Sequence, residues 1–167
     1  MIIICGWASI GSNGKASGDK AGDQNGREVR TGVLYNFGQT KVIRYKNASK
    51  GKKAGQICKD ICNNSHVGYD QGERFDLFTE LKKVKWSVSK LKVNCETDCS
   101  QLCVTCANAV GIKVPNCATG NMADVFTSTK KLGLKQFTKL PYHPGMKLQP
   151  GDMLIAPGHH VIMVISA

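Results

Sequence analysis

The sequence predicts an α+β fold. Three observations support this: strand-like segments come first, helical periodicity fills the middle of the chain, and two apolar strands close it. Such segregation differs from the strand–helix alternation of α/β proteins. With 167 residues, 41% of them apolar and 21% charged, the chain can bury a real core, and we expect one domain over residues 1–167.

Strand-forming residues dominate the first part of the chain. We expect strands over residues 2–8, 29–37 and 41–45, where β-branched and aromatic residues favour extended backbone. Residues 11–26 form a loop rich in Gly, Asp, Asn and Lys that is too long for a plain turn. Loops of this length are often functional.

Helical periodicity follows. Apolar pairs four residues apart predict a helix over 54–63, and three-and-four spacing predicts a long amphipathic helix over 73–91. The other face of the second helix is rich in lysine, which either faces solvent or offers a surface to a polyanionic substrate. Two more helices are expected over 98–110 and 121–132, each followed by a glycine.

The last third of the chain predicts a hairpin. A short strand over 137–140 and a Pro/Gly-rich loop precede two apolar strands, at 152–156 and 160–165. Pro157-Gly158 divides these two strands and is a turn signal.

The helix that begins at Asp98 carries a cysteine in its first turn. Asp98 can cap this helix, and Gln101 completes a capping-box pattern. Unpaired N–H groups and the positive end of the helix dipole then favour Cys99 as a thiolate, the nucleophilic form. Cys103 and Cys106 share its face and are expected in the core. A buried structural cysteine is the competing interpretation of Cys99.

His160 begins the closing apolar strand. A histidine held on a strand is a common general base for a cysteine nucleophile, although taken alone a satisfied core histidine is the simpler interpretation. The hairpin fixes His160 on the sheet, where the cysteine helix is the best candidate neighbour. His159 points to the opposite face of a regular strand, so only one of the two is expected to reach Cys99.

Eight cysteines leave two alternatives open. Met1–Cys5 is apolar but short, and no basic segment precedes it, so we expect a first strand rather than a secretory signal, and reduced cysteines rather than disulfides. Zinc is the other alternative. Its candidate ligands are Cys95, Cys99, Cys103, Cys106, His159 and His160. Three of them would lie along one helix, whereas structural zinc usually takes paired cysteines in loops, so we expect no metal and no cofactor.

The net charge of +11 indicates an anionic partner, which can be nucleic acid, a membrane surface or an acidic wall polymer. Aromatic residues make up 7% of the chain and do not interleave with its lysine runs, which argues against nucleic acid. No stretch approaches the roughly 18 apolar residues of a transmembrane segment.

Several sequence blocks, taken together, resemble one enzyme family. In chain order they are Lys20–Val29, Gly68–Gln71, Glu96–Ser100, Leu148–Leu154 and His160–Met163. With Asp98-Cys99-Ser100 opening a helix, they resemble the NlpC-type papain-like cysteine peptidases. The closest likeness is to lysins encoded by bacteriophages and prophages of Gram-positive bacteria, and it extends over nearly the whole chain.

The resemblance implies a papain-like central antiparallel sheet with the cysteine helix packed on it. It also implies hydrolysis of a peptidoglycan amide bond, within the stem peptide or between muramic acid and L-alanine. Cys99 matches the family nucleophile, His160 its base, and Tyr69 an active-site tyrosine. The family's histidine-orienting residue stands on a later strand, but only seven residues follow His160, so Asp23 or Gln24 supplies that group or the enzyme works as a dyad. Gln24 could also stabilise the oxyanion.

We therefore expect peptidoglycan and anionic wall polymers as partners, and a protein made in the bacterial cytoplasm that acts on the wall after release. Two other functions stay open. One is a basic, non-catalytic module that binds wall polymer or another polyanion. The other is a papain-like acyl transferase that uses the same dyad.

Overall fold

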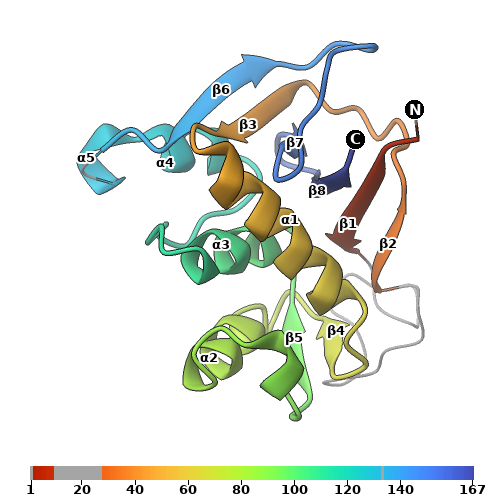
Figure 1. Ribbon diagram of the computed structural model, residues 1–167, viewed down its shortest axis with the longest axis vertical. Helices are drawn as coiled ribbons and strands as arrows, with labels where there is room; N and C mark the ends of the chain where they lie inside the picture. Colours follow the sequence, from red (N-terminus) through yellow and green to blue (C-terminus); the bar gives the residue numbers. More distant parts are fainter. Residues whose placement is uncertain (1, 10–27, 133) are drawn as a thin grey trace.

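A six-stranded antiparallel sheet forms the centre of the molecule (Figure 1). The computed structural model describes residues 2–9, 28–132 and 134–167. The order of the strands is β2-β1-β8-β7-β3-β6. These strands are β1 (Ile4–Ala8), β2 (Val29–Val33), β3 (Lys41–Tyr45), β6 (Phe137–Pro141), β7 (Met153–Ala156) and β8 (His160–Ser166). A separate parallel pair joins β4 (Val67–Tyr69) to β5 (Cys95–Thr97).

Helices cover one face of this sheet. They are α1 (Ala48–Cys62), α2 (Asp76–Lys83), α3 (Cys99–Ala109), α4 (Met122–Thr127) and α5 (Thr129–Leu132), with a short 3₁₀ turn, η1, at Val88–Lys90. The helices α1 and α3 pack on each other and against β1 and β8 (Figure 1). This confirms the α+β class and the antiparallel sheet with the cysteine helix packed on it.

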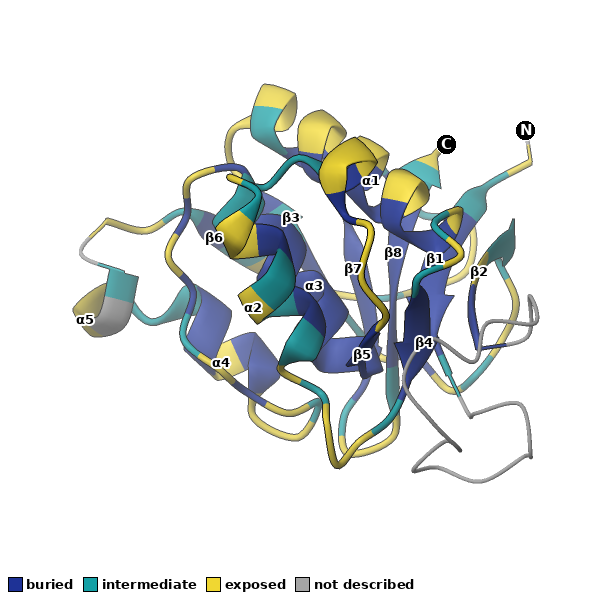
Figure 2. Cartoon of the chain, turned by 90° about the horizontal axis from the view of Figure 1, so that it is seen from below, coloured by how far each residue is buried: buried dark blue, intermediate teal, exposed yellow. Residues whose placement is uncertain are grey.

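Strand alternation divides the core into two clusters. In β8, Val161 and Met163 face α1 and α3 in the larger, helix-side cluster. Ile162 and Val164 belong to a smaller second cluster, which contains no helical residue and lies on the other face of the sheet. As its apolar sequence predicts, β8 is therefore buried on both faces, and Figure 2 shows this burial across the middle of the sheet.

The predicted long helix over 73–91 is wrong, because α2 ends at Lys83. Two consecutive residues, Lys85 (φ 54°) and Trp86 (φ 64°), adopt left-handed backbone. The Trp86 N–H donates to the Leu81 carbonyl at 2.8 Å and the Lys85 N–H donates to the Lys82 carbonyl at 3.1 Å, which is the Schellman pattern of helix termination. Glycine usually occupies the position of Lys85, so the sequence carried no stop signal there.

Other boundaries shift for local reasons. The first helix begins at Ala48 rather than 54, because the side chain of Asn47 accepts a hydrogen bond from the Lys50 N–H and caps it. The helix predicted over 121–132 is split at Ser128, which has extended backbone. The strand predicted over 29–37 ends at Val33. The predicted loop over 11–26 lies outside the described residues.

All eight cysteines are buried, and none of them is paired in the structure. The sequence analysis placed Cys103 and Cys106 in the core, and both are fully enclosed there. Among the described residues, no helix is long and apolar enough to cross a membrane.

We expect Lys85→Gly to raise the free energy of unfolding by about 1 kcal/mol, because glycine adopts left-handed backbone without the steric penalty of a side chain. Lys82→Gly is the matched control. Lys82 is an exposed lysine inside α2, so that change should lower stability by about 0.5–1 kcal/mol. Urea unfolding followed by circular dichroism measures both. If both variants lost the same free energy of unfolding, the left-handed backbone of Lys85 would not be strained.

Candidate active site

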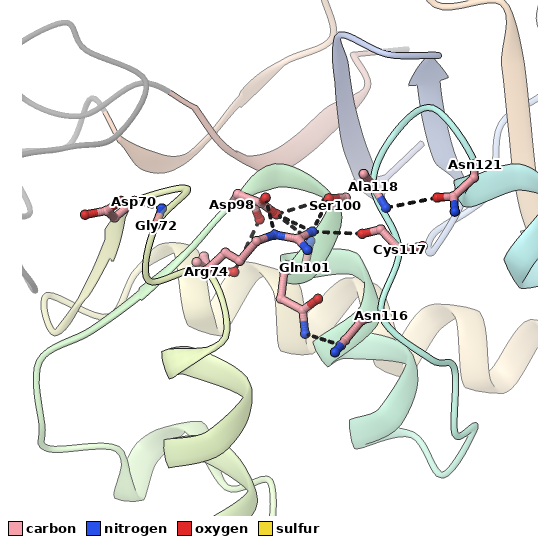
Figure 3. A network of polar contacts seen from close by, with 11 residues as sticks. Asp70, Gly72, Arg74, Asp98, Ser100, Gln101, Asn116, Cys117, Ala118 and Asn121 are labelled. Carbon is pink, nitrogen blue, oxygen red and sulfur yellow. Dashed lines mark hydrogen bonds and ion pairs between the residues drawn. The ribbon is translucent and has the colours of Figure 1, made fainter.

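An ion pair fixes the N-terminus of α3 (Figure 3). The Asp98 carboxylate accepts a hydrogen bond from the Gln101 N–H at 2.8 Å, so it caps the helix as predicted. Arg74 holds the same carboxylate through Nε at 2.5 Å and also donates to Ser100 Oγ and to the Cys117 carbonyl, each at 2.8 Å. Both charged side chains are largely buried. These bonds join the first turn of α3 to Arg74, which precedes α2, and to Cys117, which follows α3.

The capping box expected from the sequence forms only in part. The side chain of Gln101 does not return to the cap but donates from Nε2 to Asn116 at 3.2 Å (Figure 3). Asn116 belongs to the segment that follows α3, so this bond and the Arg74 bond to Cys117 both tie that segment to the start of the helix.

Cys99 is the first residue of α3 and is 8% exposed. The pKa of its thiol is raised to about 11, first by burial and then by the neighbouring Asp98 charge. Three backbone N–H groups oppose this rise in pKa, those of Val161, Ser100 and Cys99 itself. The expected lowering of the pKa at this helix terminus is therefore wrong for the resting protein. Desolvation outweighs the N–H groups, and the sulfur is a protonated thiol at neutral pH.

The contact between Cys99 and Val161 places the cysteine where two strands part. In β8 the Val164 N–H donates to Asp152, next to β7, so by alternation the Val161 N–H points toward β1. The pairing of β1 with β8 ends at Gly6 and Met163, before Val161 is reached. The Val161 N–H is therefore left to the Cys99 sulfur, and Cys99 lies beside the residue that follows His160.

His160 begins β8, as predicted, but points away from α3. It has the strand parity of Ile162 and Val164, which lie in the second cluster. Its ring packs edge-on against Phe37, with centroids 5.3 Å apart. The expectation that it faces the cysteine helix is thus wrong: by strand parity and by its contact with Phe37, the ring lies on the second-cluster side of the sheet. His159 lies in the turn before the strand and is exposed.

Burial also sets the chemistry of His160. It lowers the pKa of the imidazole to about 4, so the ring is neutral at physiological pH. Its Nε2 atom is buried and has no hydrogen-bond partner among the described residues. The two candidate orienting residues, Asp23 and Gln24, lie outside those residues. Within the described part, the ring is oriented by packing against Phe37.

Two tyrosines lie close enough for the charge of Cys99 to influence them. Tyr69 ends β4, pairs in register with Thr97, and has a pKa raised to about 12 by burial and by the Cys99 and Asp98 charges. Tyr35 is 41% exposed, and its pKa is also raised, first by burial and then in part by Cys99.

Sequence analysis missed Tyr35. The signal that could have found it is the alternation of Tyr35 and Phe37 after a strand, which puts two aromatic rings on one side. The rings of Trp7, Tyr35, Phe37 and His160 form a continuous row, with successive centroids 5.3, 5.4 and 5.3 Å apart.

A cavity of about 500 Å³ opens beside this row. It is lined by Leu34, Tyr35, Asn36, Gln39, Tyr142 and Pro144. Tyr35 lines this cavity and is also a tyrosine whose pKa the Cys99 charge helps to raise. Apolar walls with a few polar groups are typical of a ligand site.

No group of three or more His, Cys, Asp or Glu side chains within residues 2–9, 28–132 and 134–167 could hold a metal ion. Among the candidate zinc ligands, Cys95, Cys103 and Cys106 are enclosed in the helix-side core, whereas His159 is exposed in the turn before β8. The chemistry that the arrangement offers is that of a thiol, an imidazole and two phenols.

One protein family matches this chain. The family model described as an endolysin-like domain matches residues 5–167, which include every helix and strand except the first residue of β1. The searches of curated proteins and of solved structures gave no match.

We expect alkylation of Cys99 by iodoacetamide to accelerate about tenfold per pH unit between pH 7 and 10, because the thiolate fraction rises in that proportion below a pKa of about 11. Peptide mass spectrometry of the folded protein measures the rate. Cys5, buried and with a pKa of about 12, is the internal reference and should react more slowly. A Cys99 rate that is already level at pH 7 would mean a preformed thiolate.

Proposed function

Since the chain belongs to the endolysin-like domain family, we propose that it is a cysteine-dependent hydrolase of peptidoglycan. Membership in this family supports a lytic role at the cell wall. The finer proposal is an NlpC-type, papain-like catalytic domain over residues 1–167 that cleaves an amide bond. That bond lies within the stem peptide or between muramic acid and L-alanine. The observation that carries the proposal is Cys99 at a capped helix N-terminus, against the backbone N–H beside His160.

The proposed reaction begins from a neutral pair. The Cys99 thiol transfers its proton to the neutral imidazole of His160 as the sulfur attacks the carbonyl carbon of the substrate. The oxyanion that forms lies at the N-terminus of α3, where the Cys99 and Ser100 N–H groups point. Tyr35 and Tyr69 have raised pKa values, so both stay protonated and can donate to it.

The second half of the reaction returns the proton. The imidazolium of His160 protonates the leaving amine as the C–N bond breaks, which leaves a thioester on Cys99. Water then loses a proton to the neutral imidazole and attacks the thioester. The products are a carboxylate and the regenerated thiol, so no cofactor or metal takes part.

A third residue would serve to orient the imidazole ring of His160. Packing against Phe37 supports a dyad whose imidazole is held by an aromatic ring rather than by a polar side chain. In the alternative form of the proposal, Asp23 or Gln24 accepts from the unpartnered Nε2.

The net charge of +11 supports attraction to a wall rich in anionic polymers, with peptidoglycan as the substrate. We propose synthesis in a bacterial cytoplasm, release by a phage-encoded or prophage-encoded programme, and action on the wall from then on. Nucleic acid has no place in this proposal.

One observation favours a second candidate function. The raised pKa of Cys99 would equally suit a buried structural cysteine in a non-catalytic module that binds wall polymer. The two predictions below separate the candidates.

We expect Cys99→Ala and His160→Ala each to reduce wall hydrolysis about a thousandfold or more, because each removes one half of the proton-transfer pair. The matched controls are Cys103→Ala, one turn along the same helix, and His159→Ala, the adjacent exposed histidine. Both should keep most of the activity. Mass spectrometry of released fragments measures hydrolysis and names the bond, and circular dichroism confirms folding. Full activity in folded Cys99→Ala would show that hydrolysis does not depend on this thiol and would overturn the proposal, whereas a folded wild-type protein that binds the wall without cleaving it would favour the binding module.

We expect the acid limb of kcat/KM to lie near pH 4 rather than near 6.5. The pKa of His160 is lowered to about 4 in the folded protein, so the imidazole stays neutral and basic as the pH falls toward that value. A soluble peptidoglycan fragment is the substrate, and circular dichroism at each pH checks folding. An acid limb between pH 6 and 7 in fully folded protein would show that the imidazole titrates as an ordinary exposed histidine.

A further inference from the structure

A cleft of about 680 Å³ lies at the other end of α3 from Cys99. It is lined by Phe78, Lys82, Trp86, Asn108, Gly111, Lys113, Val114 and Pro115. The helix has 11 residues, so roughly 15 Å of helix separates this cleft from the thiol. The mechanism proposed above uses none of these residues. Figure 1 shows α2 and α3 side by side below α1. These helices carry Phe78, Lys82 and Asn108, and the other lining residues lie in the segments that follow them.

Backbone strain holds one aromatic wall of the cleft in place. Trp86 and the residue before it, Lys85, both have positive φ, a conformation that disfavours L-residues by about 1–2 kcal/mol each. This geometry sets the indole of Trp86 edge-on to Phe78, with ring centroids 5.2 Å apart. Strain that persists in this way is concentrated at functional sites.

Two lysines stand at the rim of this cleft. Lys82 comes from α2 and Lys113 from the segment after α3, and both are exposed. Within the described part of the chain neither forms an ion pair, whereas the neighbouring Lys83 is paired with Glu80 at 2.7 Å. The lining contains no acidic residue. The cleft therefore combines aromatic surface with uncompensated positive charge.

We propose that this cleft is a second, non-catalytic site that binds an anionic, sugar-containing polymer of the cell wall. The apolar C–H face of a sugar ring packs on Trp86 and Phe78, and a phosphate or carboxylate group lies between Lys82 and Lys113. The identity of the natural ligand rests on the proposed function, because a wall hydrolase meets such polymers at its substrate. The site gives this one chain a means of holding the wall independently of the nucleophile.

The experiment uses the full chain with Cys99→Ala, so that nothing is digested. The probe is a sugar-phosphate polymer released from Gram-positive walls, and the readout is protection of tryptophan emission from acrylamide. The chain has two tryptophans and Trp7 is buried, so protection reports on Trp86. We expect saturable protection with the sugar-phosphate polymer and none with polyphosphate, a polyanion without sugar. Equal protection by polyphosphate would overturn the proposal.

A charge-matched pair of variants tests the two lysines. Lys82→Gln with Lys113→Gln should weaken binding about tenfold, since two ion pairs of up to about 1 kcal/mol each are lost. Lys52→Gln with Lys53→Gln removes the same charge from exposed positions on α1 and should change binding less than about twofold. Equal weakening in the two pairs would mean attraction by net charge alone and would overturn the site.

Different experimental results would refute the hydrolase proposal and the cleft proposal. If the wild-type protein cleaves no peptidoglycan while the Cys99→Ala chain still binds the polymer at Trp86, the hydrolase proposal fails and the cleft stands. If soluble stem-peptide fragments are cleaved but the Lys82 and Lys113 variant binds polymer like its parent, the cleft proposal alone fails.

Discussion

The ion pair between Arg74 and Asp98 is the constraint on which the candidate site depends. It closes the N-terminus of α3 and joins it to the segment that precedes α2 and to the segment that follows α3. A buried pair of this kind adds little net stability, but loss of one partner leaves a buried charge, at a cost of about 3–5 kcal/mol. The same Asp98 charge raises the pKa of Cys99. Asp98 therefore both positions the first turn of α3 and adds to the effect of burial, which is the larger cause of the raised pKa.

The end of the pairing between β1 and β8 is the second constraint, because it leaves the Val161 N–H to the Cys99 sulfur. Cys99 comes from the helix face and His160 from the second-cluster face, and the Val161 N–H that contacts the sulfur belongs to the residue after His160. If the pairing continued past Met163, β1 would accept a hydrogen bond from the Val161 N–H. The thiol of Cys99 would then lack this donor and would be an ordinary core thiol like that of Cys103. The site thus requires an incomplete strand pair, and β8 supplies it at its first residues.

The sequence correctly predicts those features whose signals are local. Asp98 as a cap, the hairpin at Pro157-Gly158 and the burial of Cys103 and Cys106 all follow from residue type and spacing, and the structure confirms them. It failed at Lys85, where a left-handed residue without glycine ends a helix. It also failed on the pKa of Cys99, because desolvation depends on what packs over the sulfur, which no local pattern records. The face on which His160 lies required the register of β8.

The two ends of α3 have electrostatic potentials of opposite sign. At the N-terminus the helix dipole and the free N–H groups favour negative charge, so the oxyanion proposed beside Cys99 would be stabilised without any cationic side chain. At the C-terminus the dipole repels an anion with about half an elementary charge. An anionic ligand at the cleft therefore needs positive side chains to reverse the local field, and Lys82 and Lys113 are the lining residues that carry such charge. The same helix can thus serve an anionic transition state at one end and an anionic polymer at the other, by different means.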